Sequence, residues 1–274
     1  MRLRVLTMNV QHDVGDPRRS ALINAEIRRL APDVVTFQEV RYPDVSDQLA
    51  VLVAGTGLRT THQAAVLDHL PPDADVYGGT ALATRWPHRV VDVVEGRTAD
   101  GLYWYTLAAL VDVPDLGPLL VVTPTTFWKT DAEVWRERQM LEVADLDARH
   151  RTRLPTIVAG DFNAVPDSSS IRFLSGLQSL EGRSVQYHDA WAVAGEGPGH
   201  TWTVDNPAGA AEIERLVGQP GVRSRIDYVF VGCPHAHPDA RARIVGVQLV
   251  GDGPVDGVWL SDHYGVLADL EYAG

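Results

Sequence analysis

Polar clusters interrupt five apolar, strand-like stretches of this sequence, and this pattern constrains the fold more than any other feature. The clusters are Asn9, Gln38-Glu39, Gly160-Asp161-Phe162-Asn163, Arg225-Ile226-Asp227-Tyr228 and Ser261-Asp262-His263-Tyr264. An unpaired carboxylate taken out of water costs several kcal/mol or more, so a buried strand gains nothing by ending in one. We therefore expect the clusters to converge on one site, and a divalent cation is the simplest common target.

The chain length and composition favour one large domain. The sequence has 274 residues, of which 45% are hydrophobic, and this is enough to bury a substantial core. No Pro/Gly/Ser-rich linker divides the chain, and the polar clusters extend from Asn9 to His263. A site built from them needs both ends of the chain, so we expect a single domain over residues 1–274.

Cysteine usage and hydropathy indicate the compartment. The single cysteine, Cys233, cannot form an intramolecular disulfide, and Met1 is followed by Arg-Leu-Arg-Val-Leu rather than by a signal-like apolar stretch. No apolar run approaches the ~20 residues that cross a bilayer. We expect a cytoplasmic protein without a membrane span, and the sequence leaves its oligomeric state open.

The net charge of −12, from 36 acidic and 24 basic residues, bears on the partners. Nonspecific binding to nucleic acid depends on Lys and Arg side chains that replace condensed counterions. A nucleic acid is therefore a possible but disfavoured ligand. The net charge does not exclude such a ligand, because a bound metal would neutralise several of the acids.

Strand and helix periodicities alternate along the chain. Strands are predicted for residues 3–10, 33–40, 80–84, 90–94, 102–113, 119–123, 156–159, 225–231, 243–249 and 264–272. Helices are predicted between Ser20 and Pro32, from about Asp131 to Arg149, and from about residue 167 to 177. In the second helix, Asp131 is the expected N-cap and Val134 one of the apolar positions.

Eight short motifs occur in a fixed order over nearly the whole chain. They are Thr7-Met8-Asn9-Val10, Phe37-Gln38-Glu39-Val40, Ala81 to Pro87, Arg138-Gln139, Gly160-Asp161-Phe162-Asn163, Thr201-Trp202, Arg225-Ile226-Asp227-Tyr228 and Ser261-Asp262-His263. Each is weak alone, but the ordered set resembles the endonuclease/exonuclease/phosphatase superfamily. The resemblance implies an α/β (α+β) fold of the DNase I-like type, a four-layer sandwich of two packed mixed β-sheets flanked by helices. It also implies a metal-dependent phosphoester hydrolase at one edge.

The chemistry of phosphoester hydrolysis predicts the metal ligands. An enzyme must neutralise charge on the nonbridging oxygens, activate water and stabilise the leaving oxygen. Glu39, Asp262 and the amide oxygen of Asn9 form the expected ligand set, and Asn9 is also an expected substrate contact. Hard oxygen ligands favour Mg²⁺, and Mn²⁺ would fit almost as well.

Four further residues are expected to carry the catalytic roles. His263 directly follows a proposed ligand, so it can act as general base or as a donor to the phosphoryl oxygens. Asp227 is the expected partner that orients its ring. Asp161 and Asn163, spaced by two, emerge on one side of an extended segment, and the resemblance implies that they position water and contact the phosphate. Whether Asp161 or His263 takes the proton stays open.

One position departs from the family pattern. Many members carry Asn-Thr-His-Leu on the strand before the Arg-x-x-Gln helix, whereas this chain has Thr123-Pro124-Thr125-Thr126-Phe127-Trp128. Thr126 takes the place of the histidine, and a hydroxyl can form hydrogen bonds but cannot carry positive charge. Lys129, Arg138 and His12 are the candidates that could compensate, and Thr126, Lys129 and Arg138 are expected substrate contacts.

Three functions are compatible with these residues. The first is a Mg²⁺-dependent phosphodiesterase or phosphatase that acts on a phosphorylated small molecule or another exposed phosphoester. The second is a DNA or RNA nuclease. The third keeps the fold for a different biosynthetic or binding role, since function does not follow from fold alone. Segment 233–237, Cys-Pro-His-Ala-His, is interpreted as a loop rather than a zinc site, because no second Cys/His pair lies at the required spacing.

Overall fold

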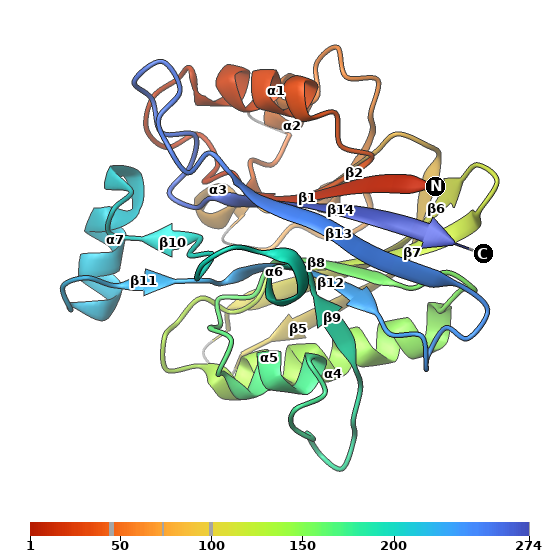
Figure 1. Ribbon diagram of the computed structural model, residues 1–274. Helices are drawn as coiled ribbons and strands as arrows, with labels where there is room; N and C mark the ends of the chain where they lie inside the picture. Colours follow the sequence, from red (N-terminus) through yellow and green to blue (C-terminus); the bar gives the residue numbers. More distant parts are fainter. Residues whose placement is uncertain (44–46, 73, 99–100, 274) are drawn as a thin grey trace.

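Two mixed β-sheets dominate the computed structural model of the protein, which describes residues 1–43, 47–72, 74–98 and 101–273 (Figure 1). Each sheet has six strands, and helices lie on the outer faces of the pair. This is the predicted four-layer, DNase I-like arrangement. No helix within the described ranges combines the length and apolar character that a membrane span requires.

The first sheet brings the two ends of the chain together. Its strands, in spatial order, are β13 (Arg241–Val250), β14 (Gly265–Ala273), β1 (Arg2–Asn9), β2 (Val34–Val40), β4 (Gly79–Thr84) and β3 (Arg59–His62). Strand β1 pairs in parallel with β2 and antiparallel with β14. The N-terminal strand therefore lies at the centre of the sheet beside the C-terminal strand.

The second sheet is built from the middle of the chain. Its strands, in spatial order, are β5 (His88–Arg97), β6 (Tyr103–Val113), β7 (Gly117–Pro124), β8 (Ile157–Asp161), β12 (Asp227–Gly232) and β9 (Tyr187–Asp189). Strands β8 and β12 are antiparallel, with Asp161 opposite Asp227. Two acids of the predicted site are thus neighbours across one strand pair.

Three apolar clusters hold the layers together. The facing sides of the two sheets share one cluster, in which Val5 and Leu82 of the first sheet join Val121 and Val229 of the second. Helix α1 (Arg19–Leu30) covers the outer face of the first sheet, and α4 (Glu133–His150) covers the outer face of the second (Figure 1). The remaining helical segments are α2 (Gln48–Leu52), η1 (Gln63–Ala65), α3 (Ala74–Tyr77), α5 (Ser169–Leu174), α6 (Ala190–Ala194) and α7 (Pro207–Val217).

Most of the predicted elements are present, with two corrections in the long helix. Helix α4 begins at Glu133, and its N-cap is Ala132, whose side chain cannot accept the capping hydrogen bond expected of Asp131. Val134 is 64% exposed rather than buried. The inward-facing residues of α4 include Arg136, Gln139 and Met140, so the helix buries polar groups toward one end.

A projection made of α7 and a two-stranded hairpin was not predicted. The hairpin pairs β10 (Trp202–Thr203) with β11 (Arg223–Ser224), and α7 connects the two strands. Figure 1 shows this unit extending to one side of the sandwich. Asn206 caps α7 at Ala208 N and also donates to the backbone carbonyl of Ser261 at 2.8 Å, so the projection is tied to the segment that carries the C-terminal cluster.

Candidate active site

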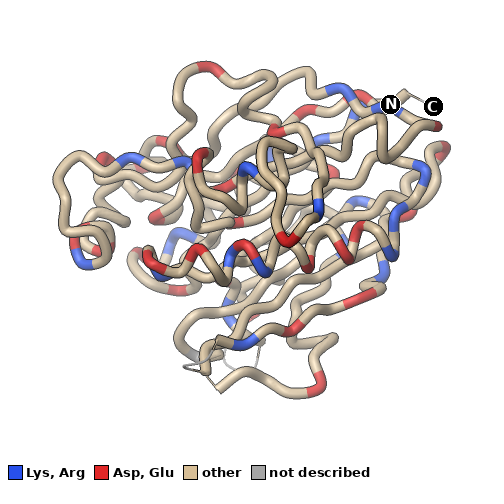
Figure 2. The backbone as a smooth tube through the Cα atoms, turned by 90° about the horizontal axis from the view of Figure 1, so that it is seen from below, with Lys and Arg blue, Asp and Glu red and all other residues tan. Residues whose placement is uncertain are grey.

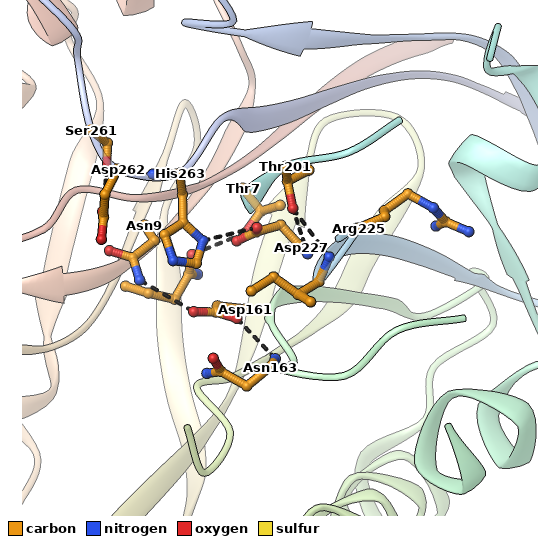
Figure 3. A network of polar contacts seen from close by, with 12 residues as sticks. Thr7, Asn9, Asp161, Asn163, Thr201, Arg225, Asp227, Ser261, Asp262 and His263 are labelled. Atoms are coloured by element: carbon orange, nitrogen blue, oxygen red, sulfur yellow. Dashed lines mark hydrogen bonds and ion pairs between the residues drawn. The ribbon is translucent and has the colours of Figure 1, made fainter. Parts of the chain in front are cut away.

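Asn9, at the end of β1, links two acids from different sheets. Its Nδ2 atom donates to Oε1 of Glu39 at 2.9 Å. The same atom donates to Oδ2 of Asp161 at 3.2 Å (Figure 3). Its Oδ1 atom accepts the backbone N–H of Gln11 at 2.9 Å, and this backbone donor fixes which side of the amide is oxygen. The Asn9 oxygen keeps a second lone pair for a ligand, so its contact with a metal remains a prediction. The geometry also makes Asn9 a residue that positions two carboxylates.

Glu39 reaches the site through an irregularity in β2. The register between β2 and β4 shifts between Phe37 and Val40, and Glu39 adopts a φ of 55°, in the left-handed region that is unfavourable for a non-glycine residue. The segment before β4 approaches Glu39 closely at Gly78, where an added Cβ atom would lie 2.7 Å from the carbonyl carbon of Glu39. Backbone strain of this kind concentrates at functional sites.

Glu39 and Asp262 repel each other. The Glu39 side chain is 31% exposed, and its pKa is raised to about 8 by desolvation and by the negative charge of Asp262, against the opposing effects of Asn9 and His263. Asp262 is held by the hydroxyl of Ser261, which donates to its Oδ1 atom at 3.1 Å. A cation between the two carboxylates would relieve this repulsion, so the donor set of Glu39 and Asp262 fits Mg²⁺ or Mn²⁺.

Asp161 ends β8 beneath Asn9, and its backbone carbonyl accepts the N–H of Thr126 at 3.0 Å. Burial and the charge of Asp227 raise the pKa of Asp161 to about 7, although nearby His263 opposes the shift. Asn163 follows with a φ of 46°, donates its backbone N–H to Asp161 Oδ1 at 2.9 Å, and donates its side-chain amide to the carbonyl of Thr126 at 3.1 Å. Both predicted members of this motif therefore lie in the cluster.

His263 and Asp227 form a buried pair. Oδ2 of Asp227 lies 3.0 Å from Nδ1 of His263, so Nδ1 carries the proton and Nε2 remains for a ligand. Thr201 accepts the backbone N–H groups of Ile226 and Asp227 at its Oγ1 atom, at 3.1 and 3.2 Å.

The charge state of His263 follows from its surroundings. Burial alone would lower the pKa of His263, but the carboxylates of Asp227, Asp161 and Asp262 together raise it well above its ordinary value. These carboxylates therefore favour the protonated, cationic form of His263. Within the described residues, only Asp161, Asp227 and His263 gather three metal-type side chains closely enough to share an ion, and the Cys233 to His237 segment does not.

An open cleft of about 500 Å³ exposes this cluster. Its lining includes six of the residues that meet at the sheet edge: His12, Glu39, Asp161, Asn163, Asp262 and His263. Trp202 and Arg215 of the projection also line the cleft, and the centres of the Trp202 and His263 rings are 6.4 Å apart. Asp227 does not line the cleft and lies behind the His263 ring, which fits an orienting role.

The residues expected to replace the missing histidine lie in different places. Thr126 is 4% exposed, and its Oγ1 atom has no hydrogen-bond partner among the described residues. The Lys129 ammonium lies 5.7 Å from the centre of the Phe127 ring. The Arg138 side chain is 65% exposed on the outside of α4 and lies 3.9 Å from Glu142. Arg138 is not among the described residues that line the cleft, so the structure does not bring it to the cluster. His12 enters the cleft, with Nε2 3.7 Å from Oε2 of Glu39.

Two residues of α4 that the sequence analysis did not assign to the site organise the loop after β7. The buried Arg136 guanidinium donates to the carbonyls of Phe127 and Lys129 at 3.0 and 2.7 Å. Gln139 accepts the backbone N–H of Phe127 at 3.0 Å and donates to the carbonyl of Thr125. The pair has the Arg-x-x-Gln spacing of the family pattern, which could have identified Arg136 in place of Arg138.

A family model described as the Endonuclease/Exonuclease/phosphatase family matches residues 6–263, a range that extends from before Asn9 to His263. The chain belongs to this family. No curated protein matches the sequence. Membership agrees with the sandwich fold and with the position of the acidic cluster at one edge of both sheets.

Solved structures share the fold of this family member at low sequence identity. TDP2 from D. rerio, complexed with a single-strand DNA product, is 19% identical with a TM-score of 0.70, over 98% of this chain and 99% of that chain. An endonuclease/exonuclease/phosphatase from Beutenbergia cavernae is 25% identical with a TM-score of 0.66, over 100% and 72% of the two chains. The human Nocturnin catalytic domain is 18% identical with a TM-score of 0.69, over 99% and 95%.

Proposed function

We propose that residues 1–274 form one catalytic domain and that it is a divalent-metal-dependent hydrolase of a small or exposed phosphoester. The observation that carries this proposal is the meeting of two kinds of group in one cleft. Glu39 and Asp262 offer hard, mutually repelling oxygen ligands. Asp161 and His263 offer a carboxylate and a cationic imidazole at the same place. Family membership supports the same reaction class.

Glu39 and Asp262 would hold the ion. When bound, Mg²⁺ or Mn²⁺ supplies positive charge to the phosphoryl oxygens and to the developing charge of the transition state. Asn9 holds the Glu39 and Asp161 carboxylates through one amide nitrogen, so the metal ligand and the water-positioning acid keep a fixed relation.

Asp161 is the proposed group that orients the attacking water and accepts its proton. Its pKa of about 7 places the carboxylate near the optimum for a general base at neutral pH. The cationic His263 is then the proposed donor to a phosphoryl oxygen through Nε2, with Asp227 holding the ring. In this proposal Asp161, rather than His263, takes the proton of the attacking water.

His12 does not replace the charge of the missing family histidine in this proposal. Burial lowers the pKa of His12 below its ordinary value of 6.5, with partial compensation by Asp13 and Asp262, so the ring is neutral at pH 7. Thr126 is also neutral. The positive charge available to the phosphoryl group from the protein would then come mainly from His263.

Hydrolysis of chromogenic phosphomonoesters and phosphodiesters tests the proposal. Mg²⁺ or Mn²⁺ should stimulate turnover, EDTA should abolish it, and His263→Ala should reduce kcat at least about a hundredfold, the usual scale for loss of an acid–base group. The exposed Glu196→Gln variant is a control for an unrelated charge change. No metal-dependent turnover of either ester type would favour another use of the fold.

A nucleic-acid end is the second candidate substrate. Trp202 and Arg215 are among the residues that line the open cleft, and D. rerio TDP2, which shares the fold, was solved with a single-strand DNA product. Against this stands the net charge of −12, and Figure 2 shows Lys and Arg interspersed with Asp and Glu along the chain. Oligonucleotide cleavage with a steep salt dependence would favour this candidate.

A further inference from the structure

A second cavity adjoins the catalytic cleft and shares Glu39, Tyr77, Trp128 and Asn163 with it. Several of its other lining residues come from segments for which the sequence indicated no role. They include Tyr42, Tyr103, Trp104 and Tyr105, and Phe127 adds a further aromatic side chain. A cavity with this aromatic lining, open beside a phosphoester site, has the composition of a small-molecule subsite.

The cavity has room for one flat group. Its volume is about 100 Å³, of the order of the space that holds a single six-membered ring. The centres of the Tyr77 and Trp128 rings are 6.3 Å apart, and the ring planes are inclined to each other by 35°. Tyr77 is 42% exposed, although a large aromatic ring usually packs against other residues. An inserted ring would cover part of that surface.

The charge distribution of the cavity favours an uncharged occupant. Glu39 is the only charged residue among the described residues that line it, and the proposed metal would bind that carboxylate and neutralise its charge. At the same end, Thr126 contributes a buried hydroxyl that has no partner in the part of the chain that the structure describes, and the neighbouring Asn163 amide donates to the Thr126 carbonyl. Leaving a buried hydroxyl without a partner is destabilising, so a ligand oxygen that accepts a hydrogen bond from Thr126 would be stabilised.

From these observations we propose that the cavity is a specificity subsite that binds one planar, uncharged ring of the substrate, attached close to the phosphoryl group. The inference rests on the proposed phosphoester function, because the phosphoryl group is what would place the ring there. The aromatic walls stack on the ring, and the end formed by Glu39, Thr126 and Asn163 meets the phosphoryl side.

Phenylphosphonate and methylphosphonate test this subsite. The two compounds carry the same head group, and their C–P bond is not a phosphoester, so binding can be measured by calorimetry with Mg²⁺ whether or not the protein turns over esters. The wild-type protein should bind phenylphosphonate at least about fivefold more tightly, given the usual strength of aromatic stacking. In Tyr77→Ala and in Trp128→Leu, the ratio of the two affinities should fall toward one.

Leu177→Ala, which removes an apolar side chain that is 65% exposed, is the control and should keep the wild-type ratio. Equal affinities in the wild type, no binding of phenylphosphonate, or an unchanged ratio in both variants would overturn the proposal. If 2-(trimethylammonio)ethylphosphonate gained more affinity over methylphosphonate than phenylphosphonate does, the proposal would also be overturned, because the aromatic walls would then bind a cation. Ring selectivity without ester turnover would leave the subsite standing and refute the hydrolase.

Discussion

Replacing Glu39 by Gln should stabilise the metal-free protein at alkaline pH. The pKa of Glu39 is raised from an ordinary 4.5 to about 8, a difference of 8 − 4.5 = 3.5, with desolvation as the main cause and Asp262 as the second. Between these values the folded protein holds a proton that the unfolded chain releases, so stability falls as pH rises from about 4.5 to 8. Below that window, Glu39 contributes no penalty.

The magnitude follows from the shift and from solvent screening. At 1.36 kcal/mol per unit, the full shift would correspond to ~4.8 kcal/mol. The Glu39 side chain is 31% exposed, and water screens part of this effect, so we expect roughly 2 kcal/mol at pH 8.5. For a chain of this size, that difference raises Tm by roughly 4–6 °C. The glutamine oxygen can still accept the Asn9 amide.

Thermal unfolding in EDTA at pH 5 and pH 8.5 measures this effect. Glu39→Gln should raise Tm at pH 8.5 and leave it nearly unchanged at pH 5, while Glu196→Gln, at an exposed position, should change neither. Added Mg²⁺ should stabilise the wild type and not Glu39→Gln. A Glu39→Gln protein that melts lower than the wild type at pH 8.5 in EDTA would show that the carboxylate is not repelled in the metal-free site.

Three further predictions follow from individual contacts. Asp227→Asn removes the nearest charge that raises the pKa of His263, so the alkaline limb of kcat/KM against pH should move to lower pH. An unmoved limb would exclude protonated His263 as the donor to the phosphoryl oxygen. Arg136→Met leaves the carbonyls of Phe127 and Lys129 without their buried donor. Urea unfolding should show that the free energy of unfolding falls by about 3 kcal/mol or more. A decrease below ~1 kcal/mol would contradict the anchoring role of Arg136. Thr126→Val replaces a hydroxyl that has no partner among the described residues by an isosteric methyl group, so Tm without ligand should stay equal or rise. A fall of several degrees would indicate that the hydroxyl has a hydrogen-bond partner.

Strand periodicity was sufficient to predict the framework of the site. Apolar runs such as those before Asn9 and Asp161 formed strands that deliver the polar residue at the sheet edge, because burial fixes both the strand and its end. The four catalytic candidates His263, Asp161, Asn163 and Asp227 meet as a connected group. The roles proposed for them remain predictions.

Details that depend on a single atom or on the face of a helix could not be predicted in this way. Arg138 was chosen for its position in a motif, yet Arg136 lies three and four residues from Gln139 and Met140 and so shares their buried face. The orientation of the Asn9 amide depends on the backbone N–H of Gln11, which no sequence pattern reports. The aromatic cavity combines side chains from segments remote in sequence, so no local signal marked it.

The anomalous difference map of a Mn²⁺-soaked crystal would test the central claim most directly, because it locates the ion itself. The account predicts one peak in contact with a carboxylate oxygen of Glu39 and one of Asp262, with the Asn9 amide nitrogen still directed at Glu39. A peak held instead by Asp161, Asp227 and His263, or no peak at the sheet edge at all, would contradict it.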